Sequence, residues 1–135
     1  MEDLEITSYD GEGYKALVYF GAWRVAVLNY TPRNRRGNIS RIEKHVQTDE
    51  VFVLLKGNCE LLIAGSNETY GDIKRIKMEP GSIYNIKKNI WHACELEPNT
   101  SVLIVENGDT SEANSIRVNL PPFPAKSRRS FRPCR

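Results

Sequence analysis

Two histidines and two glutamates are the residues best suited to chemistry in this sequence. His45 and His92 are the only histidines of the chain, and Glu43 and Glu50 stand two residues before and five residues after His45. Imidazole and carboxylate groups together suit borderline or hard divalent metals, and no thiolate is placed to compete. We expect these four side chains to converge on one divalent metal ion (manganese, iron, zinc or nickel) that keeps coordination positions open for a substrate.

The same residue types also suit other roles. The two histidines could be hydrogen-bonded core residues, with Glu43 a carboxylate at the rim. Glu43 could also stay unligated and act as a general base. Our hypothesis assigns catalysis to Glu43, Glu50 and His92. A glutamate removes a proton from a small hydroxy or carbonyl acid, His92 holds the ion or passes the proton on, and a C–N or C–O bond breaks.

Three further residues are candidates for binding the substrate. Arg41 has the strand parity of Glu43 and His45, and its planar guanidinium can bind both oxygens of a carboxylate. A solvated loop arginine is the alternative for Arg41. Tyr84 and Asn85 precede His92 in sequence, and we expect them to line the mouth of the cavity.

Two neighbours of His92 are expected to have structural roles. Trp91 must face away from His92 if the strand is regular, so it should pack in the core or against another subunit. Cys94 shares the parity of His92 and should point inward as a small buried hydrophobe, because nothing nearby suggests an activated thiol.

The elements that must position these residues are short strands. Residues 51–55, an unbroken apolar run closed by Lys56-Gly57-Asn58, predict a buried strand. The only helical signal is a short turn at 110–114, which Thr110 or Ser111 could cap. Many short strands without a long amphipathic helix indicate an all-β sandwich or barrel. The other predicted strands are 16–20, 23–28, 60–64, 73–78, 82–86, 90–94 and 101–105.

The spacing around His45 resembles the first motif of the cupin superfamily. That motif runs Gly, five residues, His-x-His, three or four residues, Glu, six residues, Gly. Gly37, His45, Glu50 and Gly57 stand at matching places, and Glu43 replaces the first histidine.

The second cupin motif is matched more loosely. Gly81 and His92 are in register with it, whereas Lys87 and Asn89 replace its proline and second glycine. The matching segments are 37–57 and 80–96. The resemblance implies a small single-domain cupin with a double-stranded β-helix, or jelly-roll barrel, and few short helices.

Within the superfamily the chain resembles ureidoglycolate lyase. The matching residues are Glu43-Lys44-His45, Thr48, Pro80-Gly81, Asn85 and Trp91-His92. The resemblance implies an enzyme that breaks ureidoglycolate into glyoxylate and urea, with Glu43, His45 and His92 in its site. Glu50 and Asn89 depart from that family, which has Gln and Gly there.

Other classes of function remain open. A cupin sugar isomerase or epimerase would use the same metal on a sugar or sugar phosphate. A non-catalytic cupin would bind a small molecule without turnover. A nucleic-acid binder would work through the basic tail, and its affinity would fall steeply with salt.

Length and charge suggest one domain with a tail. The 135 residues suit a single cupin domain over 1–120, followed by a Pro- and Arg-rich tail over 121–135. Residues 126–135 hold five basic residues and no acid. We do not expect nucleic acid as a partner, because the rest of the chain offers no matching basic pattern.

The remaining composition predicts a cytoplasmic protein. The acidic start MEDLEITSYD is not a signal peptide, and no stretch is long and apolar enough to span a bilayer. Three widely spaced cysteines argue against a disulfide framework. Apolar residues on both parities at 51–55 and 101–105 suit strands buried on two sides, which favours a homodimer that binds a small molecule.

Overall fold

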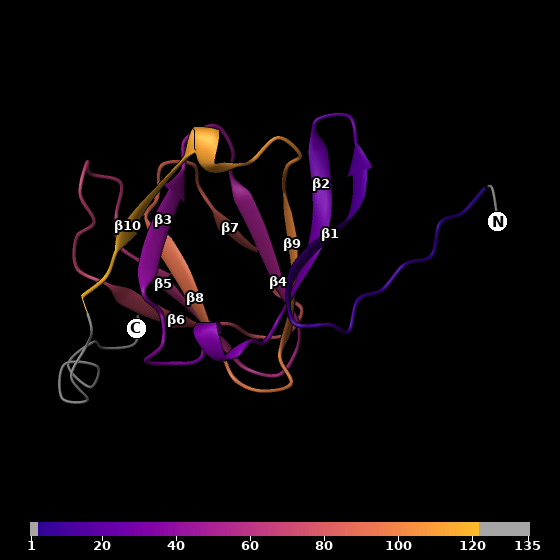
Figure 1. The fold of residues 1–135 in the computed structure, drawn as a ribbon, viewed down its shortest axis with the longest axis horizontal. Coiled ribbons are helices and arrows are strands. Elements are labelled where there is room, and N and C mark those ends of the chain that lie inside the picture. Colours follow the sequence, from indigo (N-terminus) through magenta and orange to yellow (C-terminus); the bar gives the residue numbers. More distant parts are fainter. Residues whose placement is uncertain (1–2, 122–135) are drawn as a thin grey trace.

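The structure, a computed structural model, describes residues 3–121. Within them ten strands form two five-stranded antiparallel sheets that face each other (Figure 1). All of the predicted tail except residue 121 lies outside the described residues, and so does Cys134. The proposed domain limits stay predictions. No helix among residues 3–121 has the length and apolar character needed to cross a membrane.

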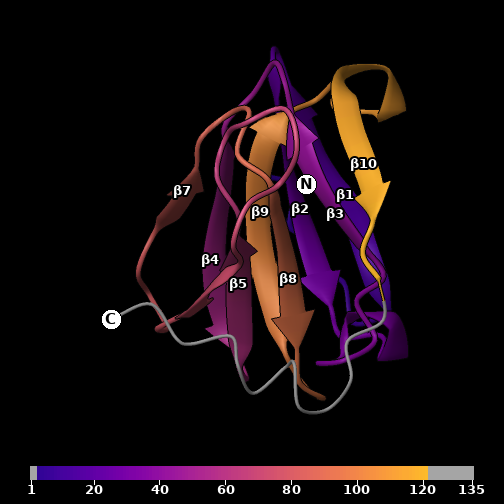
Figure 2. The same cartoon turned by 90° about the vertical axis from the view of Figure 1, so that its left-hand side faces the viewer.

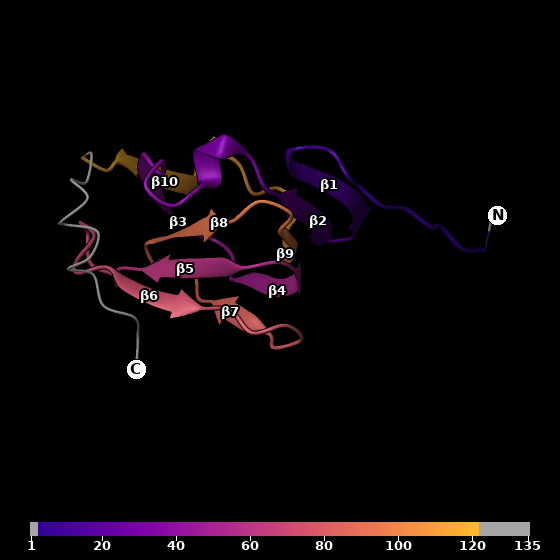
Figure 3. The same ribbon diagram turned by 90° about the horizontal axis from the view of Figure 1, so that it is seen from below.

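The first sheet carries strands from both halves of the chain. Its order is β1 (Gly13–Phe20), β2 (Trp23–Asn29), β9 (Ser101–Asn107), β4 (Glu50–Lys56) and β7 (Tyr84–Ile86). Residues 3–8, before β1, run away from both sheets (Figure 3).

The second sheet holds the remaining five strands. Its order is β10 (Ser115–Asn119), β3 (Arg41–His45), β8 (His92–Leu96), β5 (Cys59–Ile63) and β6 (Lys74–Lys77). Strands β7 and β10 lie at opposite outer edges of the molecule (Figure 2). This arrangement confirms the all-β prediction, and strands distant in sequence meet in both sheets.

The main core lies between the two sheets. It consists of ten buried residues: Ala26, Phe52, Leu54, Cys59, Leu61, Met78, Ile86, Leu96, Val102 and Ile104. Alternation along the strands accounts for this set, because every second side chain of β4 and β9 points toward the opposite sheet. Burial of this apolar surface is the largest favourable contribution to folding.

A second cluster covers the outer face of the second sheet. Leu61 of β5 belongs to the main core, whereas its neighbour Leu62 packs with Ile42 and Trp91 on the other side. The indole N–H of Trp91 donates to the carbonyl of Asn67, 2.8 Å away, in the loop that lies over this face. The second sheet is therefore buried on both faces.

Glycine ends strand β4 at the place where the first motif ends. Gly57 has a φ of 84°, a left-handed conformation that side chains disfavour. A Cβ atom there would lie 2.3 Å from Oγ1 of Thr100 and 2.6 Å from its Cα. Thr100 Oγ1 in turn accepts from the amide of Asn58 at 2.9 Å. Close approach of two backbones thus requires glycine at this position.

The short helical elements are 3-10 turns. One spans Pro32–Asn34 in the loop between β2 and β3, and the other spans Glu112–Asn114 before β10. Ser111 caps the second turn by accepting a hydrogen bond from the amide of Ala113. The predicted turn at 110–114 is therefore present, with Ser111 rather than Thr110 as its cap.

Candidate functional site

Strands from both sheets bring the two histidines and Glu50 together. His45 ends β3, His92 begins the neighbouring β8, and Glu50 begins β4 in the opposite sheet. The imidazole centroids are 5.2 Å apart. Glu50 Oε1 lies 3.1 Å from Nε2 of His45 and 2.9 Å from Nε2 of His92. All three side chains are buried, with at most 6% of each residue exposed. The expected convergence of residues 45 and 92 is present.

The far nitrogens of both imidazoles have fixed partners. His92 Nδ1 lies 3.0 Å from the carbonyl oxygen of Ile90, which can only accept, so Nδ1 carries a proton. His45 Nδ1 lies 2.7 Å from the hydroxyl of Ser115 in β10. Such outer hydrogen bonds orient the rings and direct both Nε2 atoms to the same point.

One backbone hydrogen bond also links the segments that carry the two histidines. The amide of Asn89 donates to the carbonyl of His45 over 2.7 Å. Asn89 has a φ of 68°, a left-handed conformation that asparagine tolerates better than most residues. The chain therefore turns sharply at Asn89 before entering β8 at His92.

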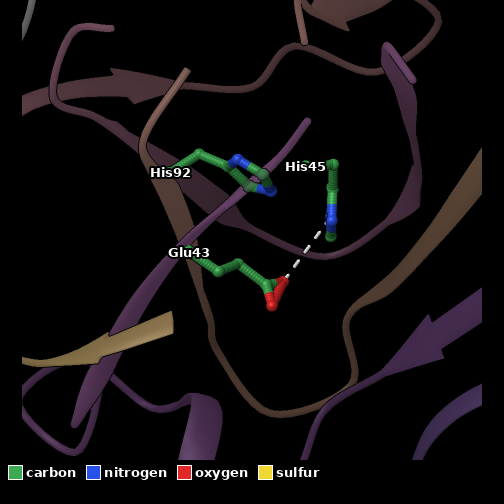
Figure 4. Close-up of side chains that lie close together, drawn as sticks. All are labelled: Glu43, His45 and His92. Atoms are coloured by element: carbon green, nitrogen blue, oxygen red, sulfur yellow. Dashed lines mark ion pairs between the residues drawn. The ribbon is translucent and has the colours of Figure 1, made fainter. Parts of the chain in front are cut away.

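Glu43 lies beside this group and is half-buried. Its backbone pairs directly with His92 across β3 and β8. Its Oε2 is 3.7 Å from Nε2 of His45, and its Oε1 accepts from Nε of Arg117 at 2.8 Å. Figure 4 shows Glu43, His45 and His92 pointing toward one another. Arg117 balances the charge that glutamate introduces where the cupin motif has histidine.

Burial and hydrogen bonding oppose each other at Glu50 and His92. Burial raises the pKa of Glu50, but hydrogen bonds and charge from His45 and His92 lower that pKa to about 2. Burial lowers the pKa of His92, whereas its hydrogen bond to Glu50 and the charge of that carboxylate raise the pKa to about 9. Without a metal, the pair is therefore an ion pair at neutral pH.

A third acidic residue of the cavity, Glu106, was not anticipated. Its Oε2 accepts from the hydroxyl of Tyr14 at 2.6 Å and from Nη2 of Arg24 at 2.8 Å. Burial raises the pKa of Glu106, and the neighbouring charge of Glu50 adds to that rise. Parity could have revealed it, since Glu106 is the second residue after the inward-facing Ile104, but the predicted strand ended at 105.

These groups line one open cavity of about 470 Å³. Arg41, proposed as a carboxylate ligand, is exposed and contributes to its lining. Tyr84 and Asn85 do not. The hydroxyl of Tyr84 accepts from the amide of Glu79 at 2.7 Å, and the Asn85 amide donates to Asp49 at 3.1 Å. The structure thus brings Arg41 to the cavity and leaves Tyr84 and Asn85 away from its lining.

The two structural expectations next to His92 agree with the geometry. Trp91 is buried in the outer cluster, on the face of the sheet away from His92. Cys94 lines the cavity and packs against the main core. Its hydrogen bond with Cys59 and its burial raise the pKa of the Cys94 thiol, so the nucleophilic thiolate is disfavoured.

The residues present fit a divalent metal ion. One ligand atom each from Glu43, His45 and His92 lie within 4.8 Å of one another, and so do ligand atoms of His45, Glu50 and Glu106. Ligands about 2.0–2.2 Å from a common ion lie within this range of each other. Two imidazoles with their outer nitrogens already bonded, together with two carboxylates, form a mixed donor set suited to manganese, iron, zinc or nickel.

The class of fold follows from comparison with solved structures. Comparison with protein-family models and with curated proteins found no match in either case. The fold does match solved structures, among them a cupin-2 domain protein. Two facing antiparallel sheets of this topology make the chain a cupin-type double-stranded β-helix.

Three of these structures illustrate the range of the likeness. A cupin-2 domain protein from Shewanella frigidimarina has a TM-score of 0.52 and 15% identity, over 73% of this chain and 84% of that one. KdgF from Halomonas has a TM-score of 0.55 and 16% identity, over 74% and 81%. A 3,4-ketoisomerase from Helicobacter canadensis has a TM-score of 0.54 and 18% identity, over 69% and 66%. At such identities the fold is shared, and function has to be argued from the site.

Proposed function

We propose that this protein is a metal-dependent cupin that acts on a small hydroxy or carbonyl acid as a lyase. His45, Glu50 and His92 would hold the ion, and Glu43 would stay unligated beside it. The observation that carries this proposal is the approach of both Nε2 atoms to Glu50 Oε1, within 3.1 Å, at the buried end of an open cavity. A bound divalent ion supplies Lewis acidity that polarises a hydroxyl or carbonyl oxygen of the substrate.

The surrounding residues have separate tasks in this scheme. His45 and Glu50 are buried and orient the site, while the half-buried Glu43 lies nearer the substrate. The Glu43 carboxylate, which accepts a hydrogen bond from Arg117, takes the proton of the substrate hydroxyl. As that oxygen becomes a carbonyl, the C–N bond breaks and its electron pair stays on nitrogen. Glu43 then returns the proton to that nitrogen.

Ureidoglycolate is the substrate we propose first. It has the hydroxyl, carboxylate and C–N bond that this scheme requires, and it gives glyoxylate and urea. The short matches from Glu43 to Trp91-His92 support it. Arg41, on the lining of the same cavity, offers a planar guanidinium to an anionic group of the substrate.

Metal analysis tests the first part of the proposal. The purified protein should contain close to one transition-metal ion per chain by plasma mass spectrometry, and His92→Ala should contain almost none. Lys87→Ala, an exposed change outside the cavity, is the control and should match the unaltered protein. Circular dichroism would establish that His92→Ala is folded. Equal metal content in all three proteins would refute the proposal.

A sugar isomerase or epimerase is the second candidate. The Tyr14–Glu106 pair favours it, because a phenol and a carboxylate on the same cavity as the histidines could exchange protons with a sugar. Glyoxylate release from ureidoglycolate, measured against interconversion of sugar phosphates, separates the two. Tight binding without turnover of either would instead indicate a ligand-binding cupin.

We also propose a cytoplasmic homodimer. Free thiols at Cys59 and Cys94 suit a reducing compartment. The outer face of the first sheet carries half-buried apolar residues such as Val53 and Leu103, and Ile6 on the segment before β1 is 83% exposed. A second copy of the chain would cover these surfaces.

A further inference from the structure

We infer that the substrate carries a second anionic group, a phosphate or a second carboxylate, held by Arg33 and Arg41 at the open side of the cavity. This inference rests on the proposed function, because it assigns the hydroxy-acid end of the substrate to the metal site. It narrows the substrate class to small hydroxy acids with two separated acidic groups, so ureidoglycolate, which has a single carboxylate, would be a weaker substrate than such an acid.

The balance of charge around the cavity is the first observation. Four arginines (Arg24, Arg33, Arg41 and Arg117) and three glutamates line it, which leaves one positive charge over before any histidine is counted. A divalent ion in the site would raise the excess to three. A cavity with this excess attracts anions and concentrates those with more than one negative charge.

The pairing of these charges is the second observation. Glu43 is bonded to Arg117, Glu106 to Arg24, and Glu50 to the two histidines. Every glutamate of the cavity therefore already has a polar partner within the described residues.

Arg33 and Arg41 are left over. Within residues 3–121, neither guanidinium makes a hydrogen bond or ion pair, although both line the cavity. Both residues are exposed, whereas His45, Glu50 and His92 are buried, so the two arginines lie toward the solvent side. Two unpaired guanidiniums at the open side of a cavity whose buried end binds a metal form a binding site for an anion.

The backbone under these two arginines is well fixed. Arg33 sits in the 3-10 turn Pro32–Asn34, where the Asn34 amide donates to the carbonyl of Thr31 at 2.9 Å and the Asn38 side chain donates to the carbonyl of Pro32 at 2.7 Å. Arg41 pairs with Asn119 at the start of β3. Little ordering of main chain is therefore needed when an anion binds.

The chemistry of guanidinium selects the ligand. Its planar fork matches two oxygens of a phosphate or carboxylate, and two such forks can bind a doubly charged phosphate from two sides. A neutral group at that end of the substrate would leave both cations without a partner. Small monoacids should consequently bind more weakly than acids with a second anion.

Matched acids test the inference on the metal-loaded protein. Three acids share the hydroxy-acid end and differ in the second group. D-glycerate has no second anion, 3-phospho-D-glycerate has a phosphate, and malate has a second carboxylate. Isothermal calorimetry at constant ionic strength should show 3-phosphoglycerate or malate binding about 10-fold or more tightly than glycerate. Whichever of the two binds more tightly identifies the class of the second group.

Variants of one loop supply the control. The double change Arg33→Gln with Arg41→Gln should remove the preference and keep the metal content. Arg35→Gln should keep both, because Arg35 is an exposed arginine of the same loop that does not line the cavity. Equal binding of all three acids, no binding of any of them, or a preference that survives the double change would overturn the inference. A protein without metal would instead refute the proposed function, and the same variants would then test the anion site alone.

Discussion

Glu50 and His92 depend on each other in the absence of a metal, and their pKa values define how stability should vary with pH. The pKa of His92 is raised from 6.5 to about 9, so its contribution is complete below pH 6.5 and disappears as pH rises through 9. The pKa of Glu50 is lowered from 4.5 to about 2, so its contribution is complete above pH 4.5 and disappears as pH falls through 2.

We therefore predict that the Glu50–His92 pair contributes most to the stability of the chelator-treated protein against urea between about pH 4.5 and 6.5. The urea concentration at the unfolding midpoint should fall as the pH rises from 6.5 to 9. His92→Gln should flatten that alkaline decline, because glutamine does not titrate. A midpoint that stays level over this range in the unaltered protein would contradict the prediction.

Glu43 separates binding from chemistry in the proposed scheme. Glu43→Gln keeps the shape of the side chain but removes the base. We expect turnover of a confirmed substrate to fall by about 10²–10⁴-fold, the usual contribution of a general base, with metal retained. Measured turnover beside metal content decides the point. Full activity in this variant would exclude Glu43 as the base.

At the scale of elements, the turn that ends β4 is the most sensitive point outside the site. In Gly57→Ala the new methyl group would meet Thr100, and the left-handed backbone would be strained. We expect a loss of more than ~2 kcal/mol in the free energy of unfolding.

Denaturant unfolding measures this loss, and Gly65→Ala is the matched control. Gly65 also has a left-handed φ, of 79°, but nothing lies within 4 Å of a Cβ built there. The difference between the two variants isolates the clash with Thr100. If both lose the same stability, the close approach of the two backbones has no energetic importance.

The sequence predicted elements where local pattern and motif spacing agreed. The apolar run at 51–55 became β4, and Trp91 and His92 point to opposite faces as alternation requires. Strand β10 was missed because Ser115–Asn119 has only two apolar residues, and pairing with β3 is what makes it a strand. Ser115 and Arg117, which contact His45 and Glu43, were missed with it.

Other parts of the site could not be read from local pattern. Tyr14 and Arg24 reach Glu106 from strands more than 80 residues away in sequence, as the separations of 92 and 82 show. Only the tertiary fold creates such contacts. Tyr84 was placed near His92 by sequence proximity, yet it packs against the core. Proximity along the chain is a weak guide in a fold whose neighbouring strands are mostly distant in sequence.

At the scale of the whole molecule, the outer face of the first sheet is the surface through which we expect two copies of the chain to form a dimer. We predict a mass near twice 15.4 kDa by light scattering after size exclusion. Val53→Glu, which places a charge on that apolar face, should give folded monomers. Ile116→Glu on β10 of the other sheet is the control, since Ile116 is 46% exposed, and it should remain dimeric. A monomer mass for the unaltered chain by light scattering would refute the proposed homodimer.

The hydrogen bond from Asn89 to the carbonyl of His45 bears on which metal the proposed site would hold. It joins the ends of two segments that carry the imidazoles, so the distance between those rings is set by the polypeptide and not by an incoming ion. A scaffold that is already assembled can release one cation and accept another without refolding. The affinities of such ligands for divalent first-row metals follow a common order. The concentrations of these metals in the cell would therefore determine which ion is bound as much as the protein does.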